Sequence, residues 1–236
     1  MTPELEKRLS EAGNQRESEH FSEAIKQYTD ILFDALSQGD YSAQIHCLCG
    51  QSLTYKILAR HTSHALYQKL TVEFSHQAIY ILEDHQEHID PRTHSIALST
   101  HADALLISSQ AAEALPFFEK SLLVTNADVP EKGRLKAHIG KVKYLTGLHQ
   151  EGKDMIISGL EDIRTGDMNQ YHIRVWETGA LNDLTRIALK EGDFTKASTL
   201  NSQSVKIATD HNLSIRLKES EALQKSINNQ DKNIVL

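Results

Sequence analysis

The chain repeats one pattern, which reads SEHFSEAIKQYTDIL at residues 18–32, SSQAAEALPFFEKSL at 108–122 and KEGDFTKASTLNSQS at 190–204. Each copy carries a turn, then a small residue where a second helix begins, then bulky residues one and two helical turns further on. Self-similarity at spacings of a few tens of residues is typical of helical repeat arrays. The pattern predicts an all-α protein built from helical hairpins.

The small residues that open the second helices give the period of the array. They are Ala24, Ala114, Gly152 and Ala197, with gaps of 90, 38 and 45 residues. Since 90 is about two periods, we expect a diverged unit between the first two, anchored at Ala65. The residues four positions later are Tyr28, Phe118, Ile156 and Asn201. Positions four apart share a helix face, so the polar Asn201 predicts weaker packing in the last repeat.

Glycine and proline mark the expected turns. Gly39-Asp40 and Gly192-Asp193 each place a helix-ending glycine before a capping aspartate. Pro91 and Pro130 precede helical stretches, and Pro116 is expected in the first turn of another helix. We therefore predict about eleven helices, which are five hairpins and a capping helix near residues 213–227.

Composition agrees with a continuous solenoid. The 236 residues are 39% hydrophobic, with only four prolines. We expect one helical repeat domain over residues 1–228 and a flexible tail over 229–236. Cys47 and Cys49 stand two apart, where a helix points them to different faces, so they do not predict a disulfide. No apolar stretch has signal-peptide or membrane-spanning character, which predicts a cytoplasmic protein without a membrane partner.

Charge is unevenly distributed along the chain. Residues 1–128 hold 9 Lys and Arg against 18 Asp and Glu, a net charge of −9, and the remainder carries +2. Nucleic-acid binding needs a basic stripe that displaces counterions from phosphates. The acidic first half therefore predicts that nucleic acid is not a partner.

The sequence resembles the tetratricopeptide repeat (TPR) family. The family's second-helix signature is matched by Phe21, Ala24 and Tyr28, by Ala114 with Phe118, and by Phe194 with Ala197. Ile139-Gly140 and Leu184 fall where the family's first helix has its Leu-Gly pair. The resemblance implies a right-handed superhelical solenoid whose concave groove, lined by first helices, holds peptides or proteins. The spacings exceed the family's usual period of about 34 residues, which leaves other helical-hairpin repeats open.

Two kinds of motif in the chain have spacings that are found in catalytic sites, but the repeat pattern offers another interpretation. Gly147-Leu-His-Gln-Glu-Gly152-Lys153 fits the start of a phosphate-binding loop, but Asp154 replaces the required Ser or Thr and no strand precedes it. We interpret Gly152 as a helix-packing residue instead. The pairs Glu17/His20 and Glu73/His76 have the Glu-x-x-His spacing of di-iron bundles, yet His20 lies at a turn. Solvated helix faces are the favoured interpretation.

Histidine is frequent, with 13 residues. The pairs His61/His64 and His85/His88 have a spacing that suits a metal on one helix face, but no third and fourth ligand follow. We interpret them as surface histidines. No nucleophile elbow or triad is recognisable, and we expect a protein that is not an enzyme and has no cofactor, no catalytic residues and no metal site.

The groove residues are the candidate site. First helices in this repeat geometry present a face at spacings of three, four and seven, and the last two hairpins place basic and hydrogen-bonding residues there. The predicted peptide-binding residues are Arg134, His138, Lys141, Tyr144, Asn182, Arg186 and Lys190. An Asn can bind a peptide backbone, and Arg or Lys can bind a carboxylate. Solvated, locally balanced charges are the other interpretation of the same face.

Two functions follow as hypotheses. The first is a non-enzymatic scaffold or adaptor that binds a protein or peptide partner in the groove, with a preference for an acidic segment. The alternative is a regulatory sensor of a peptide or small ligand, related to TPR-type quorum-sensing regulators. Self-association is a further expectation if the end hairpins expose Leu5, Ile215 or Leu217.

Overall fold

A computed structural model describes residues 1–235, and over these residues the chain forms α-helices joined by short turns, one 3-10 turn and no strand. The chain divides into two compact units, Met1–Asn126 (unit 1) and a second that begins at Ala127 (unit 2). Unit 1 contains α1 (Pro3–Glu17), α2 (Phe21–Gln38), α3 (Tyr41–Thr62), α4 (Ala65–Asp84), η1 (Gln86–His88), α5 (Pro91–Ile107) and α6 (Ala111–Val124). Unit 2 contains α7 (Val129–Leu145), α8 (His149–Ile163), α9 (Tyr171–Glu191), α10 (Phe194–Asp210) and α11 (Ser214–Asn228).

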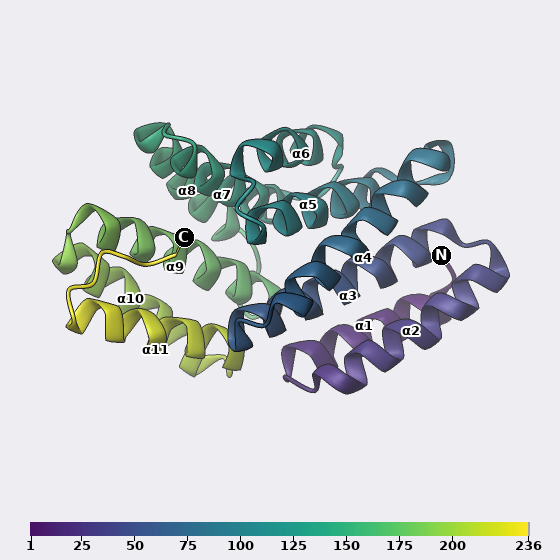
Figure 1. Cartoon of the computed structure of the whole chain (residues 1–236), viewed down its shortest axis with the longest axis horizontal. Helices are drawn as coiled ribbons and strands as arrows, with labels where there is room; N and C mark the ends of the chain where they lie inside the picture. Colours follow the sequence, from purple (N-terminus) through teal and green to yellow (C-terminus); the bar gives the residue numbers. More distant parts are fainter. Residues whose placement is uncertain (236) are drawn as a thin grey trace. The chain divides into compact units, whose positions relative to one another are not determined.

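The helices pair in chain order as hairpins, namely α1/α2, α3/α4 and α5/α6 in unit 1 and α7/α8 and α9/α10 in unit 2, with α11 packed on α9 and α10 (Figure 1). This confirms the prediction of an all-α chain of five hairpins and a capping helix.

Every second helix buries residues at the same four relative positions. In α2 these are Ala24, Tyr28, Ile31 and Ala35, and the offsets of 0, 4, 7 and 11 recur in α8 and α10. They also recur at α6, where the last position is Thr125, the residue directly after the helix. Such offsets follow one face of a helix, which is the face that packs on the first helix of the hairpin. The predicted anchors Ala24, Ala114, Gly152 and Ala197 are fully or almost fully buried.

The anchor proposed for the second hairpin was wrong. Ala65 is the first residue of α4 and is exposed. The buried positions of α4 are Thr71, Ser75, Ala78 and Leu82, which keep the offsets 0, 4, 7 and 11. Thr71 replaces the small apolar residue, and its carbonyl accepts a 2.8 Å hydrogen bond from Ser52 Oγ on α3. The Thr71 hydroxyl itself donates a 2.8 Å hydrogen bond to the Tyr67 carbonyl oxygen within α4. A buried polar anchor that is satisfied in this way explains why the apolar pattern did not reveal it.

Two pairs of glycines bring α7 and α8 into backbone contact. A Cβ added to Gly140 would lie 2.6 Å from the Gly152 carbonyl oxygen, and one added to Gly133 would lie 2.6 Å from that of Gly159. Both separations are shorter than any van der Waals contact, so no larger side chain fits without moving the backbone. The interpretation of Gly152 as a helix-packing residue is confirmed.

The turns use the predicted chemistry with one exception. Gly39 and Gly192 end helices with positive φ values of 64° and 80°, and Asp40 and Asp193 accept hydrogen bonds from backbone N–H groups of the next helix. Pro116 is not in a first turn, because α6 begins at Ala111 and contains the proline in its interior. The helix therefore starts one turn earlier than the proline suggested.

A polar side chain occupies a buried position of the last repeat. Asn201 is fully buried, and its Nδ2 donates to the Ser220 carbonyl oxygen (3.1 Å) and to Gln224 Oε1 (3.0 Å), both on α11. Asn201 Oδ1 is buried without a hydrogen-bond partner, so weaker packing in this repeat stays a prediction, although α11 supplies acceptors to Nδ2 that a helical hairpin alone would lack.

The segment after α11 lies against unit 2. Lys232 Nζ lies 5.9 Å from the centroid of the Phe194 ring, and Ile234 packs against a cluster that includes Leu189, Ala197 and Leu223. The last residue of the predicted tail, residue 236, lies outside the described residues. Of the three residues named for self-association, Leu5 and Ile215 are buried at 2% and 7% exposure, and Leu217 is half-buried.

Candidate functional site

The seven predicted groove residues lie on the first helices of unit 2, four on α7 and three on α9. Their central feature is a carboxylate that was not predicted. Asp183 Oδ1 pairs with Lys141 Nζ at 3.1 Å and with Arg186 Nη1 at 3.2 Å. The first bond joins α7 to α9, so the two predicted cations meet at one acidic side chain.

The charges around Asp183 keep it ionised. Burial by itself would raise the pKa of this carboxyl, but Lys141, Arg186 and His138 act in the opposite direction and leave the pKa below its usual value. The Lys141 and Asp183 side chains are only 8% and 14% exposed. Two permanent cations, with the imidazole of His138 nearby, therefore lie around the Asp183 carboxylate.

Arg134 and Tyr144 lie nearer the two ends of α7 and also reach α9. The Arg134 guanidinium carbon lies 5.6 Å from the centroid of the Trp176 ring, a cation–π contact. At the other end, Glu191 Oε1 accepts hydrogen bonds from Tyr144 Oη at 3.5 Å and Lys153 Nζ at 2.9 Å. The α7–α9 seam is therefore lined with cations and aromatic rings along its length.

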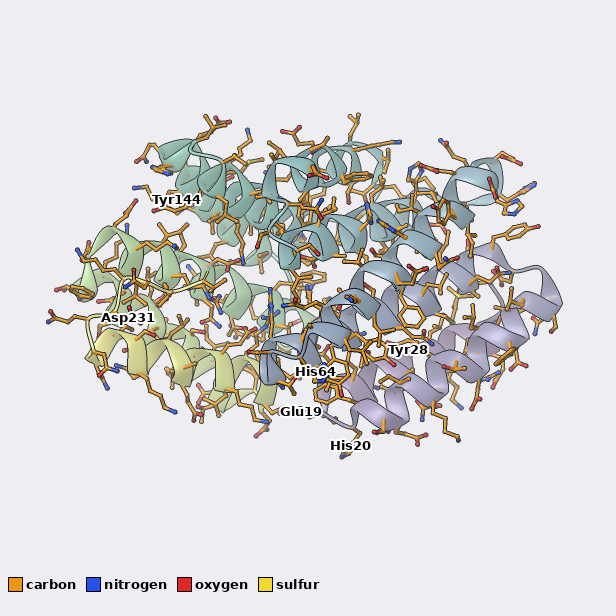
Figure 2. All side chains as sticks on the ribbon, viewed as in Figure 1. Glu19, His20, Tyr28, His64, Tyr144 and Asp231 are labelled. Carbon is orange, nitrogen blue, oxygen red and sulfur yellow. The ribbon has the colours of Figure 1, made fainter. Side chains whose placement is uncertain are left out.

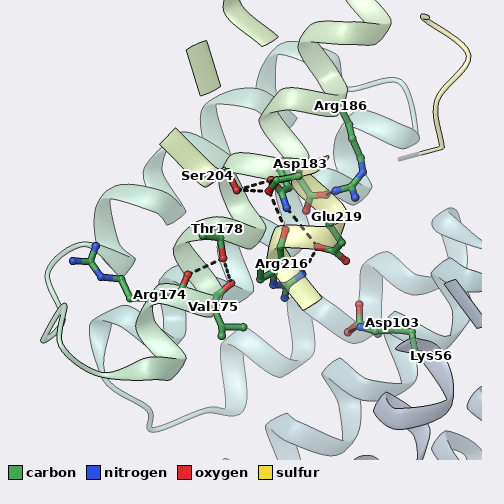
Figure 3. A network of polar contacts seen from close by, with 12 residues as sticks. Lys56, Asp103, Arg174, Val175, Thr178, Asp183, Arg186, Ser204, Arg216 and Glu219 are labelled. Atoms are coloured by element: carbon green, nitrogen blue, oxygen red, sulfur yellow. Dashed lines mark hydrogen bonds and ion pairs between the residues drawn. The ribbon is translucent and has the colours of Figure 1, made fainter. Parts of the chain in front are cut away.

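Asn182 lies in the interior and not on the predicted surface. Its side chain is fully buried, and its Oδ1 accepts hydrogen bonds from Ser204 Oγ (2.7 Å) and Ser220 Oγ (3.1 Å), while Nδ2 lies 3.4 Å from Glu219 Oε2. Ser204 and Glu219 are labelled in Figure 3. These partners belong to α10 and α11. The side chain that was expected to hold a peptide backbone instead connects three helices, whereas Lys190 is exposed.

Unit 1 contains a pocket that the sequence did not reveal. It has a volume of about 180 Å³ and is formed by α1, α2, α3 and α5. Leu9, Leu53 and Ile96 provide apolar lining. Polar groups come from Arg16, Tyr28, His46 and Thr100, and Cys49 and Gly50 complete the lining.

The Tyr28 ring is held in place at this pocket. A Cβ on Gly50 would lie 2.4 Å from the ring, so α3 and the tyrosine can approach this closely only because residue 50 is glycine. Arg16 Nη1 donates a 2.9 Å hydrogen bond to Tyr28 Oη, and Glu17 pairs with the same guanidinium. Figure 2 shows Tyr28 directed from α2 toward the interior of unit 1. The repeat pattern that contains Phe21, Ala24 and Tyr28 gives no indication that the Tyr28 ring contacts Gly50.

The residues of the motifs with catalytic associations take part in ordinary turns, helix caps and side-chain contacts. The Gly147–Lys153 segment is the turn between α7 and α8 and the start of α8, so a helix precedes it where a phosphate-binding loop needs a strand. Glu17 pairs with Arg16, and Glu73 accepts a hydrogen bond from Gln77 at 2.9 Å. His64 caps α4, and His85 stacks on Tyr41 with ring centroids 3.6 Å apart.

The described part of the chain has neither a metal-binding cluster nor a membrane-spanning helix. Within residues 1–235, no three or more His, Cys, Asp and Glu side chains gather where they could hold a metal ion. Over the same residues, no helix is at once long enough and apolar enough to cross a membrane.

The hairpins define the class of fold as a TPR-like helical repeat, which confirms the resemblance seen in the sequence. One similar solved structure is a Rap protein complexed with Competence and Sporulation Factor, with a TM-score of 0.67 and 15% identity. That match covers 94% of this chain and 64% of the Rap chain, so this chain spans less than two thirds of that protein.

A second similar structure contains nearly identical TPR-like repeats from a Podosopora anserina protein described as a kinesin light chain. Its TM-score is 0.55 at 13% identity, and the match covers 89% of this chain and 97% of that one. No known family model matches the chain. No curated protein matches it either. At these identities the structural likeness shows the fold.

Proposed function

We propose that this protein is a non-enzymatic interaction scaffold that binds a peptide or protein segment along the first helices of unit 2. The single observation that supports this most is the meeting of Lys141 and Arg186 at Asp183, with His138 beside them. An acidic group on a partner that approaches these cations would add a favourable charge interaction.

The exposure of each side chain decides whether it can contact the partner directly. Lys190 is exposed, and Arg134 and His138 are half-buried, so these side chains can meet a ligand directly. Lys141 and Arg186 are held by Asp183 and contribute through their charge. Asn182 supports the helices that carry the surface, because its side chain is enclosed by α10 and α11.

A selection of random peptides on the full chain tests the proposal. We expect enriched peptides to contain Asp or Glu, and their binding to weaken about tenfold in the double variant Arg134→Gln/Lys190→Glu. Lys196→Glu is the matched control, because Lys196 is exposed on α10, a second helix of the same unit. Equal loss in the control, or no acidic peptides, would contradict the proposal.

A regulatory sensor is the second candidate function, and the likeness to the Rap structure complexed with Competence and Sporulation Factor favours it. A sensor should change shape when a short free peptide binds, whereas a scaffold should bind its segment with little change. Small-angle scattering with and without a selected peptide separates the two: a change in radius of gyration supports the sensor.

A further inference from the structure

The pocket of unit 1 differs in character from the α7–α9 surface of unit 2. Leu9, Leu53 and Ile96 give it apolar lining, and its volume of about 180 Å³ exceeds that of a cavity of about 150 Å³ known to hold benzene. One aromatic or branched aliphatic side chain therefore fits.

The pocket is already formed, which lowers the cost of filling it. Gly50 and the Arg16–Tyr28 hydrogen bond fix the tyrosine ring, and the Cys49 thiol is buried beside it. Preorganised side chains lose little conformational freedom when a ligand binds. Thr100 and Tyr28 add hydroxyl groups that can bond a polar tip or a peptide backbone.

Charges of both signs lie at the pocket: the Arg16 guanidinium lines it and is paired with Glu17, and carboxylates act on His46. This ring lines the pocket, and the carboxylates of Asp90, Asp40 and Glu6 all act on it, opposed by the cation Arg92. Burial is the main reason that the pKa of His46 is lowered, so the imidazole is neutral at physiological pH. Residues 1–126 as a whole contain 9 Lys and Arg against 17 Asp and Glu.

We propose that this pocket binds one aromatic or branched aliphatic side chain of a protein segment in which Lys or Arg flanks that residue. The apolar side chain enters between Leu9, Leu53 and Ile96, and the flanking cations meet the carboxylates near His46, Glu6 in particular because it is exposed. The inference extends the proposed scaffold function to a second site, in the other unit and with opposite charge preference.

The same random-peptide selection on the full chain contains the test. We expect a second class of enriched peptides, with an aromatic or branched residue next to Lys or Arg. Leu53→Trp, which fills the pocket, should weaken these peptides about tenfold or more, because burial of the apolar group is lost. Leu66→Trp, on the exposed start of α4 and outside the pocket, should leave binding unchanged.

A charge reversal provides a second measurement that does not depend on the folding of Leu53→Trp. Glu6→Lys should weaken the basic peptides by about threefold, and Glu4→Lys on the same helix is the control. Absence of the basic class, or retention of its binding in both Leu53→Trp and Glu6→Lys, overturns the proposal. Loss of the acidic class alone would instead contradict the function proposed for unit 2.

Discussion

Lys141 Nζ on α7 and Asp183 Oδ1 on α9 lie 3.1 Å apart and form an ion pair between the first helices of two successive hairpins. Arg186 approaches the same oxygen at 3.2 Å from one turn further along α9. Removal of the carboxylate would leave two cations together in a largely dehydrated setting. The pair therefore holds the proposed binding surface in shape as well as setting its charge.

Asp183→Asn should lower the free energy of unfolding by about 3 kcal/mol, since breaking a buried pair strands its partner charge. Urea unfolding followed by circular dichroism measures this. The exposed pair Lys206–Asp210 provides the control, and Lys206→Ala should leave the urea midpoint unchanged. Equal effects of the two substitutions would show that Asp183 is well hydrated.

Gly140→Ala should destabilise the chain by about 3 kcal/mol or more, because its methyl group would lie 2.6 Å from the Gly152 carbonyl oxygen. Gly179→Ala on α9 is the matched control, with its nearest neighbour, the Arg216 side chain, at 3.6 Å. Helix propensity predicts a gain of about 0.5–1 kcal/mol for that control. Thermal melting of both variants distinguishes close packing from a general effect of alanine.

Asn182→Ala should cost about 2 kcal/mol, because Ser204 and Ser220 would lose their shared buried acceptor. Ser202→Ala, on the exposed side of α10, should change stability by less than about 0.5 kcal/mol. A destabilised Asn182→Ala variant that still binds its peptides at low temperature would confirm a supporting role. Direct contact with the peptide would instead weaken binding at every temperature.

Cys47 and Cys49 should resist modification in the folded protein. Burial raises the pKa of each thiol to about 12, so the reactive thiolate is scarce at neutral pH. A disulfide reagent at pH 8 should titrate neither thiol in the native chain and both in urea. Rapid reaction under native conditions would show that unit 1 opens locally.

Stability should fall as the pH is lowered from about 6.5 to about 4. Burial, with a smaller contribution from His76, lowers the pKa of His101 from 6.5 to about 4. The unfolded chain therefore binds a proton that the folded chain excludes, so the contribution is complete above pH 6.5 and is lost on acidification. His101→Gln should flatten the dependence of the urea midpoint on pH, whereas His61→Gln, at the exposed end of α3, should not.

The repeat pattern was sufficient to predict the hairpins but not every packing position. Ala24 with Tyr28 and Ala114 with Phe118 are small and large residues that face inward, and their spacing is visible in one dimension. Thr71 was missed because its polarity hides its burial, and Ala65 was chosen for its size alone. The spacing of buried positions is the same in α4 as in the other second helices, but the polar side chain of Thr71 hides the anchor from an apolar pattern.

Sequence spacing predicts which residues of the candidate surface share a face of one helix, but not which residues of different helices meet. Arg134 and Lys141 share a face of α7 because they are seven apart, but the 42-residue separation of Lys141 and Asp183 gives no periodic signal. The register between α7 and α9 brings them together. The unit 1 pocket likewise needs Leu9, Gly50 and Ile96 from three helices, and no local pattern connects them.

The glycine contacts between α7 and α8 also define a means of recognising relatives. Gly133, Gly140, Gly152 and Gly159 are separated by 7, 12 and 7 residues, and each lies against the backbone of the opposite helix. Exposed positions of this hairpin are free to change through evolution, whereas these four tolerate no added atom. Chains that share the hairpin should therefore keep this spacing of glycines after the rest of the sequence has diverged, which makes it a signature for finding them.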